Sequence, residues 1–554
     1  MNISRRDFLV QTSAGAAGLA WAPGRGVAAA AEERAAIPVG RETQLVIDDA
    51  IIERRTGLAR TLHQPKKRGL IKEADGRDWE RGAVYVGKIV CRDNAGKFHM
   101  TYRYYWWDAE LQKLPAIGID KAHWFHETVG YATSDDGIHW TKPDLGLFEA
   151  PAKFVRTDEF PFEIPQGMSR HNNFEYPIFF ARDLHAHGNI SDPDKRFLLQ
   201  VVEKRNGTDP FAKPIDAKMY FAADWPDVTD PQWKSKLTPI PRGVLSPRGL
   251  GFPLITGYDH DASEWFMTCQ DSIGNWVKRN GRDIARYSTP DLVSWKGPEL
   301  VLPVPQDEAR DPKDWVEYMD LWGHRVGGRK TGAWLGQLWI FHSDRSNPEY
   351  QMPRIENVWR KGTTEVRLVI SRDAGRTWQR VGDRQVWLPH HDEDDGYDRL
   401  PCCSCPIEVG DELRFYYACW NGEHLAFYRD GTPYYRNRMR NSSTAWATLR
   451  RDGYVSLDAG DERGEFSTKV LNVNGGAMSV NLAAARGELR VEVQNESGEP
   501  IKGFALADCQ PITGDGVALP VRWKDNRDLK SLAGKPIRLR VDLKQAALYS
   551  FQFA

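Results

Sequence analysis

The chain has 554 residues, and its 75 Lys and Arg against 76 Asp and Glu give a formal net charge of -1. This length exceeds one compact core and fits one large domain with a smaller one, or two to four ordinary domains. The charge balance argues against nucleic acid as the main partner, because a phosphate-binding surface normally shows a basic excess. The 21 Trp, 48 Gly and 33 Pro favour short strands and turns.

Residues 1–31 are predicted to be a twin-arginine export signal. Arg5 and Arg6 precede Phe-Leu and a weakly apolar run at residues 10–22, and the three alanines at 28–30 offer a small-residue cleavage site. No later segment reaches the roughly 18 apolar residues needed to cross a bilayer. We therefore expect a periplasmic or secreted protein without a membrane partner.

The elements expected after residue 40 are short strands in five sets, each with its turn. The strand-like runs lie at 88–105, 195–204, 264–271 with 285–289, 333–344 with 364–373, and 405–420 with 443–457. Radial repetition of small sheets predicts a five-bladed propeller. An early strand at 44–53 is expected to close the ring by pairing with the last set.

The turns carry a recurring motif, which is TSDDGIHW at 133–140, STPDLVSW at 288–295 and SRDAGRTW at 371–378. A short polar residue and Asp are expected to bond to the turn's own amides, Gly to take a positive φ, and Trp to pack beneath the hairpin. The motif therefore predicts a structural turn rather than a site. This excludes Asp135, Asp136, Asp291 and Asp373 as catalytic residues.

After about residue 462 the pattern changes to short alternating strands with Gly and Asn turns, as in KVLNVNGGAMSVNLAAARGELRVEVQN. This pattern predicts a β-sandwich over 461–554. The fold class is thus all-β, with a five-bladed propeller at 40–460 followed by a small β-sandwich.

The order of these segments resembles the five-bladed propeller glycoside hydrolases of the invertase, levansucrase and arabinanase kind, including exported bacterial relatives with a C-terminal sandwich. The segments that carry the likeness are QLVIDDAIIE, DWERGAVYVGKIVCRD, YATSDDGIHWTKPDLGLFE, ARDLH, ARYSTPDLVSW, SRDAGRTW and GDELRFYY. The resemblance implies hydrolysis of glycosidic bonds by two carboxyl groups on the inner strands around the funnel.

The resemblance implies that an aspartate of the first strand acts as base or nucleophile. Asp48 and Asp49 stand there, and alternation turns one of them toward the funnel, with Asp49 preferred. An acid pair that caps the strand end is the competing interpretation. Glu80 and the neighbouring Trp79 open the first full blade and are expected to contact sugar, although an ion pair with Arg81 would also explain Glu80.

Arg182-Asp183 resembles the Arg-Asp-Pro motif with which invertase-like enzymes stabilise the transition state, although Leu184 replaces the proline. Glu317, in DWVEYMDLW, is the expected general acid and Asp320 its rival, and such a donor needs its pKa raised by burial or a like charge. The Glu-Cys pair of invertase-like enzymes is absent.

The remaining substrate-binding predictions are polar residues beside the later strand starts. They are His171, Asn172, Asn173, Asp395 and His424. The DEDDG run that contains Asp395 could instead bind calcium, but it lacks the acid spacing of an EF-hand, so a solvated loop is expected. The thiols of Cys402, Cys403 and Cys405 lack the spacing of a zinc site and are interpreted as buried. No cofactor or metal is expected.

The main functional hypothesis is therefore an exported glycoside hydrolase that acts on chain ends of a plant or algal polysaccharide. One alternative is a propeller that binds carbohydrate without catalysis. That alternative would be favoured if Asp49, Glu80, Asp183 and Glu317 did not converge in one funnel. A second alternative is a sialidase-like hydrolase, which would have six blades and an Arg triad.

Overall fold

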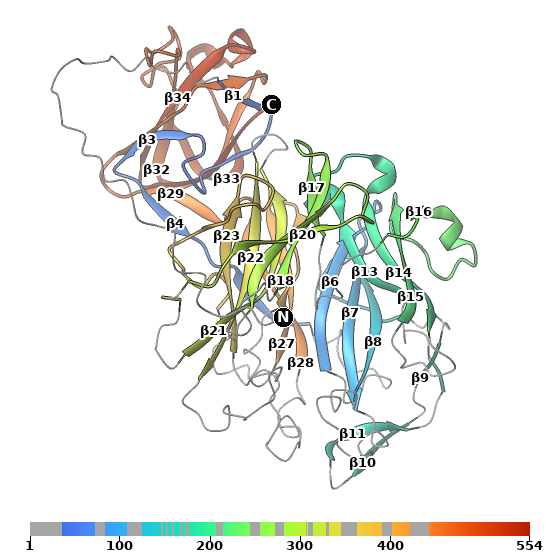
Figure 1. The fold of residues 1–554 in the computed structure, drawn as a ribbon. Coiled ribbons are helices and arrows are strands. Elements are labelled where there is room, and N and C mark those ends of the chain that lie inside the picture. The colour runs from blue at the N-terminus through green and yellow to red at the C-terminus, as the bar shows by residue number, and fades with distance from the viewer. Residues whose placement is uncertain are drawn as a thin grey trace, which may run out of the picture. The chain divides into compact units, whose positions relative to one another are not determined.

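The computed structural model describes residues 36–71, 84–107, 125–143, 145, 148–150, 153–157, 160–166, 169–171, 177–205, 214–243, 255–271, 282–305, 307–308, 314–327, 332–344, 363–389, 402–420 and 442–554. Regular structure in these ranges is almost entirely strand, which confirms the all-β prediction (Figure 1). The helices described are α1 (Leu184–His187) and short 3-10 turns at 193–195, 233–236, 524–526 and 530–532. None of them is long and apolar enough to cross a membrane.

Five antiparallel sheets follow one another along the chain and form five blades, as predicted. Blade 1 is β6 (Val84–Arg92), β7 (Phe98–Trp107) and β8 (Phe125–Ser134). Blade 2 is β13 (Ile178–Asp183), β14 (Phe197–Arg205), β15 (Pro214–Ala222) and β16 (Thr238–Ile240). Blade 3 is β17 (Ile255–Asp259), β18 (Glu264–Asp271), β19 (Asp283–Thr289) and β20 (Lys296–Leu302). Blade 4 is β21 (Asp314–Val326), β22 (Ala333–Asp344), β23 (Thr363–Ser371) and β24 (Gln379–Arg380). Blade 5 contains β25 (Cys402–Cys403), β26 (Ile407–Val409), β27 (Glu412–Trp420) and β28 (Ser442–Arg450).

The guanidinium of Arg182 joins the first strands of blades 2 to 5. Arg182 lies in β13 and donates hydrogen bonds to the Thr256 carbonyl of β17 at 2.8 Å and the Gly323 carbonyl of β21 at 2.6 Å. It also donates to Cys405 Sγ, just after β25, at 2.7 Å and to the His187 carbonyl of α1 at 3.5 Å. The residue is only 2% exposed. The first strand of each of these blades is therefore its inner strand, and Arg182 fills the centre.

The ring is closed by a strand other than the one predicted. β5 (Lys66–Leu70) pairs antiparallel with β28 as the outermost strand of blade 5, with Leu70 opposite Ala445. The expected closing segment at 44–53 contributes instead to the C-terminal sheet, where Gln44 pairs with Phe551. The prediction of closure by an N-terminal strand is thus right in kind and wrong in position.

Eleven strands form a separate sheet with its own core. They are β1 (Ile37–Gly40), β2 (Gln44–Leu45), β3 (Ile52–Thr56), β4 (Ala59–Leu62), β29 (Val455–Ala459), β30 (Gly464–Thr468), β31 (Leu471–Val473), β32 (Met478–Gln494), β33 (Ile512–Val521), β34 (Pro536–Lys544) and β35 (Ala546–Phe553). Figure 1 shows the blue strands β1, β3 and β4 among the orange and red ones. The appended β-domain is confirmed, but residues 37–62 pair with it rather than with the propeller expected from residue 40.

Four further short strands lie between blades 1 and 2. β9 (Phe148–Ala150) pairs with β12 (Ser169–His171), and β10 (Lys153–Thr157) pairs with β11 (Phe160–Gln166).

The repeated turn motif is structural, as the sequence predicts. In SRDAGRTW, Asp373 Oδ1 accepts from the Thr377 amide and Ser371 Oγ from the Gly375 amide, both at 2.8 Å, while Gly375 has φ +78°. Trp378 Nε1 donates to the Gly375 carbonyl at 3.1 Å. In the other copies, Asp136 and Asp291 each accept from the amides two and three residues later in the turn.

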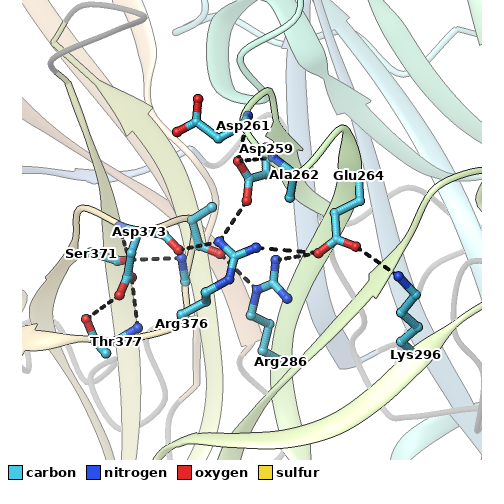
Figure 2. A network of polar contacts seen from close by, with 12 residues as sticks. Asp259, Asp261, Ala262, Glu264, Arg286, Lys296, Ser371, Asp373, Arg376 and Thr377 are labelled. Carbon is cyan, nitrogen blue, oxygen red and sulfur yellow. Dashed lines mark hydrogen bonds and ion pairs between the residues drawn. The ribbon is translucent and has the colours of Figure 1, made fainter.

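The blade 4 turn also binds blade 3 through charge pairs (Figure 2). Arg376 pairs with Asp259 at 2.7 Å and with Glu264 at 3.6 Å. Glu264 also pairs with Arg286 at 3.3 Å, and Arg286 Nε donates to the Ala374 carbonyl at 2.9 Å. The motif thus fastens neighbouring blades together, and its carboxylate is occupied by the protein itself.

Replacing Arg182 by Met is expected to lower the free energy of unfolding by about 3 kcal/mol or more, because each buried carbonyl left without a donor costs ~1–3 kcal/mol. The free energy of unfolding of Arg182→Lys should fall between those of wild type and Arg182→Met, since a lysine ammonium cannot reproduce the planar fork of the guanidinium. The exposed Arg54→Met serves as control. Denaturant unfolding followed by Trp fluorescence measures this, and equal effects of Arg182→Met and Arg54→Met would contradict a central role for Arg182.

Candidate active site

Two carboxyl side chains, Glu317 and Asp320, lie on one face of the inner strand β21. Residues three apart on a regular strand point to opposite faces, but the pairing of β21 with β22 shifts between Tyr318 and Asp320. Tyr318 and Leu321, on either side of this bulge, pack into the same core between blades 3 and 4. The extra residue at Met319 therefore returns Asp320 to the face that Glu317 occupies.

Asp320 is completely buried and is held by N–H groups from two blades. Its Oδ1 accepts from the Leu321 amide at 2.8 Å and its Oδ2 from Trp322 Nε1 at 3.1 Å. The Gln270 amide of β18 is also a hydrogen-bond donor to it. Burial nevertheless prevails and raises the pKa of Asp320 to about 7. This carboxyl can therefore gain or lose a proton near neutral pH.

The contact lies on the part of β18 that follows Met267. The described part of β17 begins at Ile255, which pairs with Met267, and the residues before Ile255 lie outside the described part of the chain. There β18 meets β21 directly, and Thr268 Oγ1 donates to the Leu321 carbonyl at 3.3 Å. The Gln270 side-chain oxygen is buried without a hydrogen-bond partner among the described residues.

Arg282, at the start of β19, supplies a positive charge to both carboxyl groups. Its Nη1 lies 3.9 Å from Glu317 Oε1, and its charge lowers the pKa of Asp320 against the larger effect of burial. The Arg282 carbonyl accepts from the Tyr318 amide at 3.0 Å, which fixes β19 beside β21. The Glu317 side chain is 16% exposed. Because Asp320 is covered, Glu317 is the carboxyl group of this pair that can reach a ligand, and Asp320 with Arg282 sets its surroundings.

The structure places Asp48 and Asp49 outside the funnel. They lie in a bend before β3, where Asp49 pairs with Arg60 at 2.6 Å and Asp48 with Arg372 at 2.8 Å. The Asp49 side chain is 56% exposed, and the Arg60 hydrogen bond lowers its pKa. The prediction that Asp49 faces the funnel as a catalytic residue is wrong, because its segment joins the C-terminal sheet and meets the outer turn of blade 4.

Asp183 is a helix cap at the far end of the inner strands. Its Oδ1 accepts from the Ala186 amide at 2.9 Å, which starts α1, and its Oδ2 pairs with Arg196 at 3.2 Å. The adjacent Arg182 reaches Gly323, six residues beyond Glu317 on β21, or roughly 20 Å at strand rise. Asp183 and Glu317 therefore do not converge, which contradicts the shared catalytic role predicted for them.

Several predicted site residues lie outside the described part of the chain. They are Trp79, Glu80, Asn172, Asn173, Asp395 and His424, while His171 is described only as the end of β12. Their proposed contacts with substrate stay predictions.

Two members of the cluster, Gln270 and Arg282, were missed in the sequence. Gln270 carries no local signal, because its amide meets Asp320 only through the packing of β18 against β21. Arg282 and Asp283 are charged residues just before the strand predicted at 285–289. A charged residue at the start of a strand is the signal that could have identified Arg282.

Within the described residues, no group of three His, Cys, Asp or Glu side chains is placed to hold a metal ion. Cys405 is a buried free thiol beside the guanidinium of Arg182. It has a structural contact with the inner strands of the propeller.

No protein-family model and no curated protein matches the chain. Among solved structures, it is similar to a glycoside hydrolase with 12% identity over 70% of this chain and 92% of that chain, TM-score 0.35. A family 43 arabinoxylan arabinofuranohydrolase from Bacillus subtilis has 11% identity over 89% and 99%, TM-score 0.32. A β-1,2-mannobiose phosphorylase from Listeria innocua has 13% identity over 71% and 97%, TM-score 0.34.

Asp320→Asn should change the pH dependence of stability. Between the ordinary carboxyl pKa of 3.8 and about 7, folded Asp320 keeps a proton that the unfolded chain has released, so stability falls as pH rises. At 1.36 kcal/mol per pKa unit, this amounts to about 4 kcal/mol. Between pH 4 and 8 the free energy of unfolding of wild type should therefore fall by that order relative to Asp320→Asn. Thermal or denaturant unfolding measures this.

Asp291→Asn is the matched control for this measurement. The Ser294 and Val293 amides lower the pKa of Asp291 to about 2 from the ordinary value of 3.8, so it is ionised in both states from pH 5 to 8. Over that range its difference from wild type should stay constant. An equally constant difference for Asp320→Asn would contradict a protonated, buried Asp320.

Proposed function

We propose that this protein is an exported glycoside hydrolase that removes sugar from chain ends of a plant or algal polysaccharide or oligosaccharide. The observation that carries the proposal is the placing of Glu317 and Asp320 on one face of an inner strand, with Arg282 beside them. Inner strands of a propeller face its central funnel, where small-molecule ligands are enclosed.

Glu317 is proposed as the proton donor to the leaving oxygen. Cleavage needs this acid and a second carboxylate that attacks carbon or activates water. A proton donor must lie within reach of the leaving oxygen, and the Glu317 side chain is 16% exposed, with Arg282 Nη1 3.9 Å from its carboxylate. Asp320, whose pKa burial raises to about 7, lies on the same face of the strand.

The second carboxylate must come from another inner-strand start. Glu80 before blade 1 and Asp395 before blade 5 stand at such positions in the sequence. Long insertions such as residues 106–126 favour a pocket that takes a chain end rather than an open groove. Action on chain ends is therefore part of the proposal.

A propeller that binds carbohydrate without catalysis is the second candidate. It is favoured by the structural roles of Asp49 and Asp183, which leave Glu317 as the remaining described member of the predicted convergent set. The sialidase-like alternative expected six blades, whereas the described residues form five.

A screen of purified mature protein against oligosaccharides and aryl glycosides, with and without inorganic phosphate, separates these candidates. Release of a free sugar without phosphate is the result expected for a hydrolase. Binding without release throughout the panel would favour the non-catalytic propeller.

On any substrate found, Glu317→Gln should lower kcat by at least ~10²-fold, the usual contribution of a general acid. Glu299→Gln, an exposed glutamate on the outer strand β20, should retain wild-type activity. Asp49→Asn should also retain it, because Asp49 forms a surface ion pair. Steady-state kinetics measures all three, and a loss below tenfold for Glu317→Gln would remove it from the reaction.

We also propose that residues 1–31 direct export through the twin-arginine route, as their Arg pair and Ala-rich end indicate. Replacing Arg5 and Arg6 together by Lys should retain the precursor in the cytoplasm of a host with this pathway. Cell fractionation and immunoblotting measure this. Equal export of the Lys-Lys variant would contradict the assignment.

A further inference from the structure

A cavity of about 380 Å³ lies beyond the C-terminal ends of the inner strands. Its wall combines His324 of β21 and His187 of α1 with the turn after β28, at Asp452 and Tyr454, and with strands β32 and β35 of the C-terminal sheet. The volume lies within the range of about 300–1,000 Å³ typical of small-molecule sites.

This cavity is distinct from the candidate active site. Arg182 bonds to the carbonyl groups of Gly323 and His187, so its guanidinium adjoins the inner wall of the cavity. Glu317 lies on the same strand as His324 but seven residues earlier, which corresponds to roughly 23 Å. A ligand in the cavity would therefore not touch Glu317 or Asp320.

The lining of the cavity is polar and balanced in charge. Its charged members are Arg325, Arg451, Glu408 and Asp452, and Arg451 pairs with Glu408 at 3.4 Å. Burial, reinforced by the charge of Arg182, lowers the pKa of His187 to about 4, so this histidine is neutral. The pKa of His324 is lowered by burial too. Such a wall has no excess charge with which to attract an ion.

One polar atom in this wall has no hydrogen-bond partner among the described residues. His324 uses Nε2 to contact the Tyr454 hydroxyl at 2.9 Å, but its Nδ1 is buried without a hydrogen-bond partner. The Asp452 carboxylate also borders the cavity and accepts from Ser550 Oγ at 3.1 Å. Buried polar atoms are normally satisfied, so His324 Nδ1 favours a ligand with hydroxyl groups, for which Asp452 is a further acceptor.

The rest of the wall offers small polar side chains. Ser479, Asn481 and Ser550 border the space, whereas Tyr454 and Phe551 line it with only 2% and 1% of their surface exposed. An uncharged sugar suits such a wall, because its hydroxyls need several donors and acceptors and carry no charge. We propose that this cavity binds an uncharged sugar of one or two rings, at a site separate from the candidate active site.

The test uses the mature protein and a blocking substitution at the cavity edge. Ala186 is exposed and borders the cavity, so Ala186→Trp should fill its entrance. Ala533→Trp, at an exposed position that does not border the cavity, is the matched control. The probes are galactose, arabinose, mannose, sucrose and cellobiose, with glucuronate and inorganic phosphate as charged comparisons, followed by calorimetry and saturation-transfer NMR.

A neutral sugar should bind to wild type and to Ala533→Trp, with at least tenfold weaker binding to Ala186→Trp. Circular dichroism checks folding, and Val517→Trp provides a second blocking variant if Ala186→Trp is unstable. Sugar binding unchanged in both blocking variants would overturn the proposal. Binding of glucuronate or phosphate alone, or of no probe at millimolar concentration, would overturn it as well.

Discussion

The buried guanidinium of Arg182 is the contact on which the arrangement of the inner strands depends. A planar fork with several donors in fixed directions can satisfy carbonyl groups from separate strands at once, and here it binds blades 3, 4 and 5 from its place in blade 2. Lysine could not do this with one ammonium. The Arg182 guanidinium occupies the centre of the propeller at the C-terminal ends of the inner strands. The N-terminal ends therefore stay available for the carboxyl groups of Glu317 and Asp320.

Burying this cation affects the titratable groups around it. Desolvation, with the charge of Arg182, keeps His187 neutral, and Asp183 provides a nearby negative charge that raises the pKa of the same histidine. Asp183 is itself committed to the first turn of α1 and to Arg196. The Arg-Asp pair thus organises the fold, although in sequence it resembles a motif that contacts sugar.

Sequence reasoning succeeded where the deciding interactions are local. In the turn motif, Ser371, Asp373, Gly375 and Trp378 bond within eight residues, so their spacing alone predicts their geometry. It failed for Asp48, whose partner Arg372 lies 324 residues away. Alternation could not reveal this, because it gives the face of a strand and not the sheet that the strand joins. Asp183 did carry a local signal, since an N-cap aspartate five residues before Gly188 is typical of a short helix.

For Glu317 and Asp320, the sequence identified both residues but not that their side chains lie on the same face of β21. Strand alternation places them on opposite faces, and the bulge at Met319 reverses that result. The bulge turns the Asp320 carboxyl toward β18, where the Gln270 amide donates to it. A backbone donor from blade 3 and one extra residue in blade 4 thus act together to bury a carboxyl group on the strand face that Glu317 occupies. The acid pair therefore depends on a contact between two blades, which no pattern within a single strand can reveal.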